Sequence, residues 1–225
     1  MNNKEIPKGF DYKMWSGTTP DAPYTAARCH FNFRWVNDYA PGYVTDWGAH
    51  FIDVAHWGMN TDDTGPIEIS AKNVKRREKG IYDAIESFHV RYVYKDDIEM
   101  TLFSTNDPSL WGTKFIGTEG SVFVENQKLI TDPPELLRKK LNGNDERLYV
   151  SKHHHRNFID CVFSRKRTAS SVESAHRAAS ACHLGSIAAH IGKSLKFNPK
   201  KEKFLGNSEA NDLLMRKFHG KWKLS

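Results

Sequence analysis

An acid and a histidine at helical spacing are the residues in this chain best suited to chemistry. Asp46 lies four residues before His50, and Asp53 follows three residues after it. On an α-helix, residues three or four apart share a face. Histidine titrates near neutral pH, and a carboxylate one turn away can steer its tautomer and raise its basicity. The spacing therefore fits a general base, His50, oriented by Asp46. On the next turn, Asp53 is interpreted as a structural residue or a substrate ligand.

Two other interpretations of the same spacing stay open. Most helices of globular domains are amphipathic, so this face could simply meet solvent. The 11 histidines also raise the question of a zinc site. His50 and His56 are six residues apart and fall on different faces, and the chain has no His-Glu-x-x-His motif. We predict no metal site, although a composite of Asp46, His50 and one histidine from 153–155 stays an alternative.

Further candidate ligands lie before this face and far downstream of it. Arg34, Trp35 and Tyr39 precede it, and a guanidinium could hold a hydroxyl or a carboxylate. Packing explains each of the three equally well. His154 and His155 belong to a run of histidines, but adjacent residues on a helix point in different directions. Capping and surface placement are the simpler explanation of that run, and we keep both histidines as candidate substrate ligands.

Local signals predict a helix under the Asp46–His50 pair. Thr45 and Asp46 are good N-cap residues, and Pro-Gly at 41–42 breaks the chain just before them. At about 100° per residue, a broad apolar face is expected. It would consist of Trp47, Phe51, Val54, Ala55 and Gly58. Residues 30–36, which lead into the helix, are expected to be β-like.

The remaining elements predict an α+β fold. Strands are expected at 67–74, 87–94, 98–104, 113–117, 121–125 and 128–131, with an extended segment at 196–199. Helices are expected at 133–141, 154–163, 172–191 and 207–218. Serial hairpins between helices indicate an open, largely antiparallel β-sheet with helices packed on one face. Residues 1–30 are expected to form an irregular linker, and 31–225 the substrate-binding and oligomerisation domain.

Several motifs, in order, resemble the Gfo/Idh/MocA family of NAD(P)-dependent oxidoreductases of sugars and cyclitols. The matching stretches are 31–35, 42–53, 115–124, 154–162 and 175–188. The second of them reads Gly-x-x-x-Asp-Trp-Gly-x-His-x-x-Asp, and the third contains Phe-x-Gly-Thr-x-Gly. The resemblance covers essentially the whole chain, and it is to the C-terminal domain of that family.

The resemblance implies roles for the candidate residues. Asp46 and His50 would lie beside the hydroxyl that is oxidised. His50 would take the hydroxyl proton while hydride leaves for a nicotinamide, and Asp46 would orient the imidazole or bind a substrate hydroxyl. In such proteins the open face of the sheet often serves subunit contact. We therefore expect a homo-oligomer, a dimer or larger.

Two parts of the family's machinery are not found in the sequence. Family members begin with a Rossmann domain, whose Gly-rich loop binds NAD or NADP. Here no Gly-x-Gly-x-x-Gly occurs, and the nearest run is Gly-Thr-Glu-Gly at 117–120. The family's Glu-Lys-Pro motif is also absent. We expect NAD or NADP to be held by a separate Rossmann domain. A sugar-binding module without redox chemistry, and a sugar hydrolase or lyase using the same pair, are the alternatives.

Composition narrows the class of protein. The net charge of +6 sits in short basic runs, with no nucleic-acid motif and no interleaved aromatic residues, so no nucleic-acid partner is predicted. Attraction of an anionic sugar or a cofactor phosphate stays open. No apolar run approaches the roughly 18 residues that span a bilayer, and the first residues lack a secretory signal. We expect no membrane contact and a cytoplasmic location. The three cysteines are widely spaced, and Cys161 and Cys182 are interpreted as small buried hydrophobic residues.

Overall fold

The computed structural model describes residues 5–125, 128–145, 147–216, 218 and 222. These residues group into two compact units. The first unit comprises Met1–Ala49, Pro66–Ser104 and Ala181–Ser225. The second comprises His50–Gly65 and Thr105–Ser180. Two helices, α2 (Trp47–Met59) and α4 (Val172–Ile191), contribute residues to both units.

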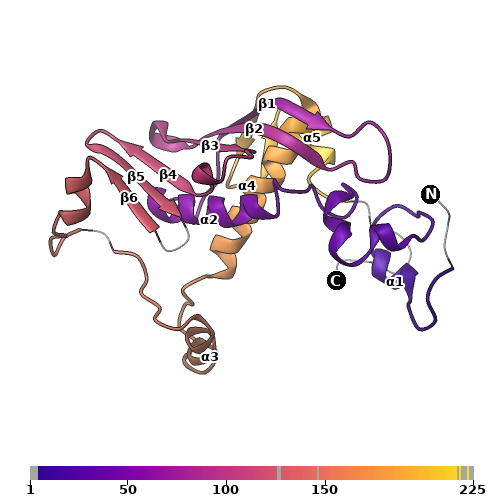
Figure 1. Ribbon diagram of the computed structural model, residues 1–225, viewed down its shortest axis with the longest axis horizontal. Helices are drawn as coiled ribbons and strands as arrows, with labels where there is room; N and C mark the ends of the chain where they lie inside the picture. Colours follow the sequence, from indigo (N-terminus) through magenta and orange to yellow (C-terminus); the bar gives the residue numbers. More distant parts are fainter. Residues whose placement is uncertain (1–4, 126–127, 146, 217, 219–221, 223–225) are drawn as a thin grey trace. The chain divides into compact units, whose positions relative to one another are not determined.

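The first unit is built on a five-stranded sheet in the order β3-β2-β1-β7-β8 (Figure 1). Its strands are β1 (Glu68–Arg76), β2 (Ile85–Val93), β3 (Glu99–Phe103), β7 (Leu195–Asn198) and β8 (Lys203–Leu205). Every pairing in the sheet is antiparallel, and η3 (Lys95–Asp97) closes the β2–β3 hairpin. The predicted strands are confirmed. The three residues of β8 are too few to show an alternating pattern, and this strand was not predicted.

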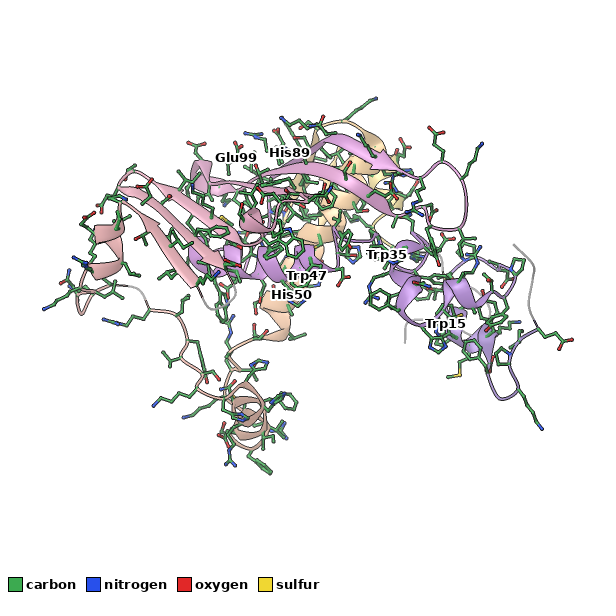
Figure 2. The ribbon with its side chains drawn as sticks, viewed as in Figure 1. Trp15, Trp35, Trp47, His50, His89 and Glu99 are labelled. Carbon is green, nitrogen blue, oxygen red and sulfur yellow. The ribbon has the colours of Figure 1, made fainter. Side chains whose placement is uncertain are left out.

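Strand alternation gives this sheet one buried and one open face. Ile69, Tyr92 and Met100 are aligned across β1, β2 and β3, and all three are buried. On the opposite face Arg91 bonds Glu99 across the same hairpin, with 2.5 Å between Nη2 and Oε2. Glu99, which pairs with Val93, and His89, which pairs with Phe103, are labelled in Figure 2 among the side chains of these strands. The sheet therefore presents a polar, charge-paired face on one side.

The C-terminal part of α4 covers the buried face. A β-carbon at Gly185 would lie 2.2 Å from the Tyr92 hydroxyl oxygen and 3.2 Å from Val90 Cγ1. Only glycine allows the helix to approach the sheet this closely. Cys182, one turn earlier, is buried, as predicted. The prediction of helices on one face of an antiparallel sheet is confirmed.

Two segments in the N-terminal part of the first unit differ from the sequence-based expectation. Residues 30–36 were expected to be β-like, but His30–Trp35 form a 3₁₀ helix, η2, and the Trp35 ring packs against Tyr43. Residues 1–30 were expected to be irregular, yet they contain α1 (Tyr12–Ser16) and η1 (Ala26–Arg28).

The last helix is also shorter than predicted. Helix α5 covers Ser208–Asp212, whereas the sequence pattern extends it to about residue 218. The apolar residues that would continue it, Leu213, Leu214 and Met215, are exposed. A short helix without a buried face is not stable in water, so the helix ends after one turn.

The second unit contains a separate sheet in the order β4-β5-β6 (Figure 1). The strands are β4 (Thr113–Gly117), β5 (Gly120–Glu125) and β6 (Lys128–Asp132). This unit also holds η4 (Pro108–Leu110), η5 (Pro134–Arg138) and α3 (His154–Ser164). The later part of α2 packs here, because Thr113 Oγ1 donates to the Phe51 carbonyl at 3.2 Å and the Phe115 ring lies against Gly58. The predicted strands are confirmed, but they divide between two sheets.

Candidate functional site

A glycine turn fixes the start of α2. Gly42 has φ of 75°, a value that favours glycine, and its carbonyl accepts a hydrogen bond from the Asp46 amide at 3.1 Å. The Gly48 amide donates to the Tyr43 carbonyl at 2.9 Å. A β-carbon at Gly48 would lie 3.2 Å from Leu102 Cδ2 on β3. These contacts hold the first turn of α2 against the five-stranded sheet.

The buried face of α2 includes Gly48. The buried residues of the helix are Gly48, Ile52, Ala55 and His56. The predicted apolar face is therefore wrong in part, because Trp47 is 53% exposed while Phe51 and Val54 are only half-buried. Glycine lets the backbone contact the sheet at a position that carries no apolar side chain. His50 consequently lies on the exposed side of α2 (Figure 2).

Arg34 and Asp46 form an ion pair that sequence reasoning missed. Arg34 Nε donates to Asp46 Oδ2 at 3.1 Å, with side-chain exposures of 22% and 35%. The guanidinium carbon lies 3.9 Å from the centroid of the Phe31 ring, and Nη1 donates to the Phe31 carbonyl at 2.5 Å. Arg34 was predicted as a substrate ligand, and Asp46 as the residue that orients the His50 imidazole or binds a substrate hydroxyl; both roles stay predictions. The spacing of three between Phe31 and Arg34 was the available signal for a cation–π contact.

Asp53 lies in a charged environment within the second unit. Burial raises the pKa of its carboxyl group, and the negative charge of Asp62 raises it further, whereas His50 lowers it. Asp62 in turn pairs with Arg167 at 3.7 Å. The structure thus brings Asp53 near His50, one turn along α2. Asp62 was missed because it follows a chain break, which carries no periodic signal.

His56 is a core residue. Its side chain is fully buried, and burial lowers its pKa to about 4, against a smaller opposing effect of Asp62. The ring is therefore neutral near pH 7. Within the described ranges, no cluster of three or more histidine, cysteine, aspartate or glutamate residues could hold a metal ion.

Trp35 and Tyr39 make packing contacts in the first unit. The Trp35 ring meets Tyr43 edge to face, with centroids 4.8 Å apart. The Tyr39 ring meets Trp15 with centroids 5.0 Å apart, which ties the N-terminal segment to the rest of the unit. Trp15 and Trp35 are labelled in Figure 2. A substrate contact of Trp35 or Tyr39 stays a prediction.

His154 and His155 occupy the first turn of α3, and both are exposed. The preceding residue, His153, is the N-cap, since its Nδ1 accepts a hydrogen bond from the Arg156 amide at 3.1 Å. The capping explanation of the histidine run is confirmed at His153. A role of His154 and His155 in substrate binding stays a prediction.

The glycine run at 117–120 does not have the geometry of a dinucleotide-binding loop. Residues 117–120 form the turn between the antiparallel strands β4 and β5, whereas a Rossmann phosphate loop joins a strand to a helix. A β-carbon at Gly120 would lie 2.2 Å from the Asp132 carbonyl oxygen. This glycine is explained by close packing of the backbone between β5 and β6, and it provides no phosphate cradle.

A comparison with protein-family models shows which family this chain belongs to. A Gfo/Idh/MocA profile described as "Oxidoreductase family, C-terminal alpha/beta domain" matches residues 1–224. The chain belongs to the Gfo/Idh/MocA family. The resemblance seen in the sequence motifs is thereby confirmed for this Gfo/Idh/MocA domain over essentially its whole length.

A solved structure supports the fold. The crystal structure of an NAD-binding protein from Listeria innocua is similar to this Gfo/Idh/MocA domain, with a TM-score of 0.50 and 15% sequence identity. The similarity covers 74% of this chain and 51% of that chain, so the domain spans about half the length of the Listeria protein. A comparison with curated proteins finds no significant match. In the part of the chain that the structure describes, no helix is both long and apolar enough to cross a membrane.

Proposed function

We propose that this Gfo/Idh/MocA domain supplies the acid–base pair for NAD(P)-linked oxidation of a sugar or cyclitol hydroxyl. The observation that carries the proposal is the placement of His50 on the exposed side of α2, one turn after Asp46 at the start of that helix. Membership of an oxidoreductase family gives this pair a chemical context. Exposure matters because a general base must reach both the substrate and solvent.

In the proposed reaction, His50 accepts the proton of the substrate hydroxyl as the C–O bond becomes a carbonyl. A nicotinamide held nearby would take the hydride, which carries both electrons of the oxidation, while the proton taken by His50 carries none. Arg34 holds Oδ2 of Asp46, which leaves Oδ1 to accept a hydroxyl of the substrate. A positioned general base typically contributes about 10²–10⁴-fold in rate.

The nicotinamide itself is proposed to bind to a separate Rossmann domain. Two observations support this. The glycine turn at 117–120 does not suit a dinucleotide. The chain also matches only half of a protein that is described as NAD-binding.

We also propose that the domain self-associates through the open face of the five-stranded sheet. Besides the charge pairs of Arg91, this face carries Phe103, which is 45% exposed and stacks on His89 with centroids 6.1 Å apart. Exposed aromatic residues inside a polar surround are typical of subunit contacts. A cytoplasmic location is part of the same proposal, supported by three buried cysteines that are free thiols.

The first test is binding by the purified chain. A panel of sugars and cyclitols would be screened by ligand-observed NMR, and NADH and NADPH would be titrated by nicotinamide fluorescence. We expect a polyol to bind and both dinucleotides to bind weakly or not at all. Tight, saturable dinucleotide binding would contradict the separate cofactor domain, and turnover of the polyol without nicotinamide would favour a hydrolase or lyase.

A further inference from the structure

A small cluster of charged and aromatic side chains surrounds Asp46 in the first unit. Arg34 is fixed there at three points: the Asp46 carboxylate, the Phe31 carbonyl and the face of the Phe31 ring. The Phe33 ring lies further from the guanidinium, at 5.4 Å. The arginine is therefore held by the protein before any ligand arrives.

The hydrogen bonds that Arg34 makes within the protein determine whether it can bind an anionic or a neutral ligand. A guanidinium recognises carboxylate or phosphate best when two parallel N–H groups face the anion. Here Nε is directed at Asp46 and Nη1 at the Phe31 carbonyl. The positive charge is matched by a carboxylate at 3.1 Å, so an anionic ligand would meet the negative charge of Asp46 together with the arginine.

An uncharged ring with adjacent hydroxyls suits the same cluster. Asp46 can accept a hydrogen bond from one hydroxyl, and Arg34 can donate to its neighbour from Nη2. The Arg34 guanidinium covers one face of the Phe31 ring, and because this residue is 68% exposed, the opposite face can meet the C–H groups of a ring. Ligand sites combine aromatic surface with a few placed polar groups in this way.

We propose that the Arg34–Asp46 pair makes this site selective for a neutral polyhydroxyl ring over sugar acids and sugar phosphates. This inference rests on the proposed function, because it concerns the substrate of the same site. The net positive charge of the sequence left open whether the chain attracts an anionic sugar, and the proposed selectivity implies that this site does not. The chain carries a net positive charge, but the positive charge of Arg34 is neutralised by the Asp46 carboxylate. A ligand beside Arg34 therefore meets no net positive charge from this pair.

The test compares matched ligands on the full chain. Dissociation constants would be measured by NMR titration for inositol and glucose, and for the anionic partners glucuronate and glucose 6-phosphate. Inositol and glucose are the neutral rings. We expect whichever of them binds better to have a dissociation constant at least tenfold lower than that of either anion. Asp46→Asn leaves the Arg34 charge uncompensated, and we expect it to reverse that preference. Asp38→Asn removes an exposed acid of the same segment and should leave the preference unchanged.

The outcomes separate two failures. Tighter binding of an anion by the unaltered chain, or an unchanged preference in Asp46→Asn with native circular dichroism, would overturn the neutral-ring inference alone. If no ring of either class binds, the proposed function fails, and the inference fails with it. Arg34→Gln is a second variant, expected to weaken the anions further because it leaves Asp46 unopposed.

Discussion

The carboxyl group of Asp53 sits where its negative charge is disfavoured. Burial and the charge of Asp62 raise its pKa in the folded state, and His50 only partly offsets them. A carboxyl group with a raised folded pKa binds more protons in the native state. The protein therefore becomes more stable relative to the unfolded chain as the pH falls through the folded-state pKa of Asp53. At neutral pH the charged carboxylate lowers the stability. Energetic costs of this kind are characteristic of functional sites.

Replacing Asp53 by asparagine should stabilise the protein at pH 7. Asparagine removes the unfavourable charge while keeping the shape, so we expect a higher melting temperature at pH 7 and a smaller difference at pH 4. Thermal unfolding followed by circular dichroism measures both. Asp63→Asn, at an exposed acid nearby, is the matched control and should change little. A lower melting temperature of Asp53→Asn at pH 7 would show that the charge is stabilising.

His56 should make the fold sensitive to acid. Burial lowers its pKa from 6.5 to about 4, so the unfolded state takes up a proton first as pH falls. Stability is complete above pH 6.5 and is lost between 6.5 and about 4, by roughly 3 kcal/mol. Urea unfolding at pH 7 and pH 4.5 measures this loss. The unfolding free energy of His56→Gln should fall less between pH 7 and pH 4.5 than that of the unaltered chain. In His190→Gln, changed at an exposed position, it should fall by the same amount as in the unaltered chain. Equal losses in both variants would refute the assignment.

The sequence predicts local spacing along a helix better than it predicts which residues pair across the fold. The spacing of Asp46 and His50 on a helix could be read directly, because it depends on local geometry. The Arg34–Asp46 pair depends on how η2 meets the start of α2, and Asp62 depends on how the chain returns after α2. Such contacts arise from tertiary packing, and a single sequence carries no periodic signal for them.

At the scale of elements, periodicity predicts the strands and long helices and fails where glycine or aromatic packing decides. The predicted face of α2 is wrong in part because it left out Gly48, whose backbone lies close to Leu102 of the sheet. Residues 30–36 are rich in aromatic side chains, which favour strands, but His30–Trp35 form a 3₁₀ helix in which Phe31 and Phe33 stay exposed. Alternating segments such as β2 follow the pattern, because burial on one face enforces it.

The packing of α4 on β2 gives a test at the same scale. Gly185→Ala would normally stabilise a helix by about 0.5–1 kcal/mol, but here the new methyl group meets the Tyr92 hydroxyl. We expect destabilisation by about 1–3 kcal/mol, or a fall in melting temperature of about 2–4 °C per kcal/mol. Thermal unfolding measures it.

Tyr92→Phe provides the matched rescue for Gly185→Ala. The Tyr92 hydroxyl is buried and has no hydrogen-bond partner among the described residues, so its removal should cost little by itself. In the double variant, Tyr92→Phe should restore most of the stability that Gly185→Ala removes. If the two effects simply add, the proposed steric contact is wrong.

At the scale of the whole molecule, the open face of the five-stranded sheet predicts self-association. Phe103→Glu places a charge on the proposed contact face, where an unpaired buried charge is costly. We expect light scattering to report a dimer or larger for the unaltered chain and a monomer for this variant. Phe163→Glu, the same change at an exposed residue of α3, should leave the oligomer intact. A chain that is monomeric at every accessible concentration would refute the interface.

The central claim is that His50 is the general base of an oxidoreductase domain that works with a separate Rossmann domain. The most direct measurement is nicotinamide reduction by the chain mixed with a cofactor-bound Rossmann domain and the polyol that the chain binds. We predict turnover that requires both domains and falls about 10²–10⁴-fold in His50→Ala, with polyol affinity little changed. Equal rates for His50→Ala and the unaltered chain, or product formed without nicotinamide, would contradict the account.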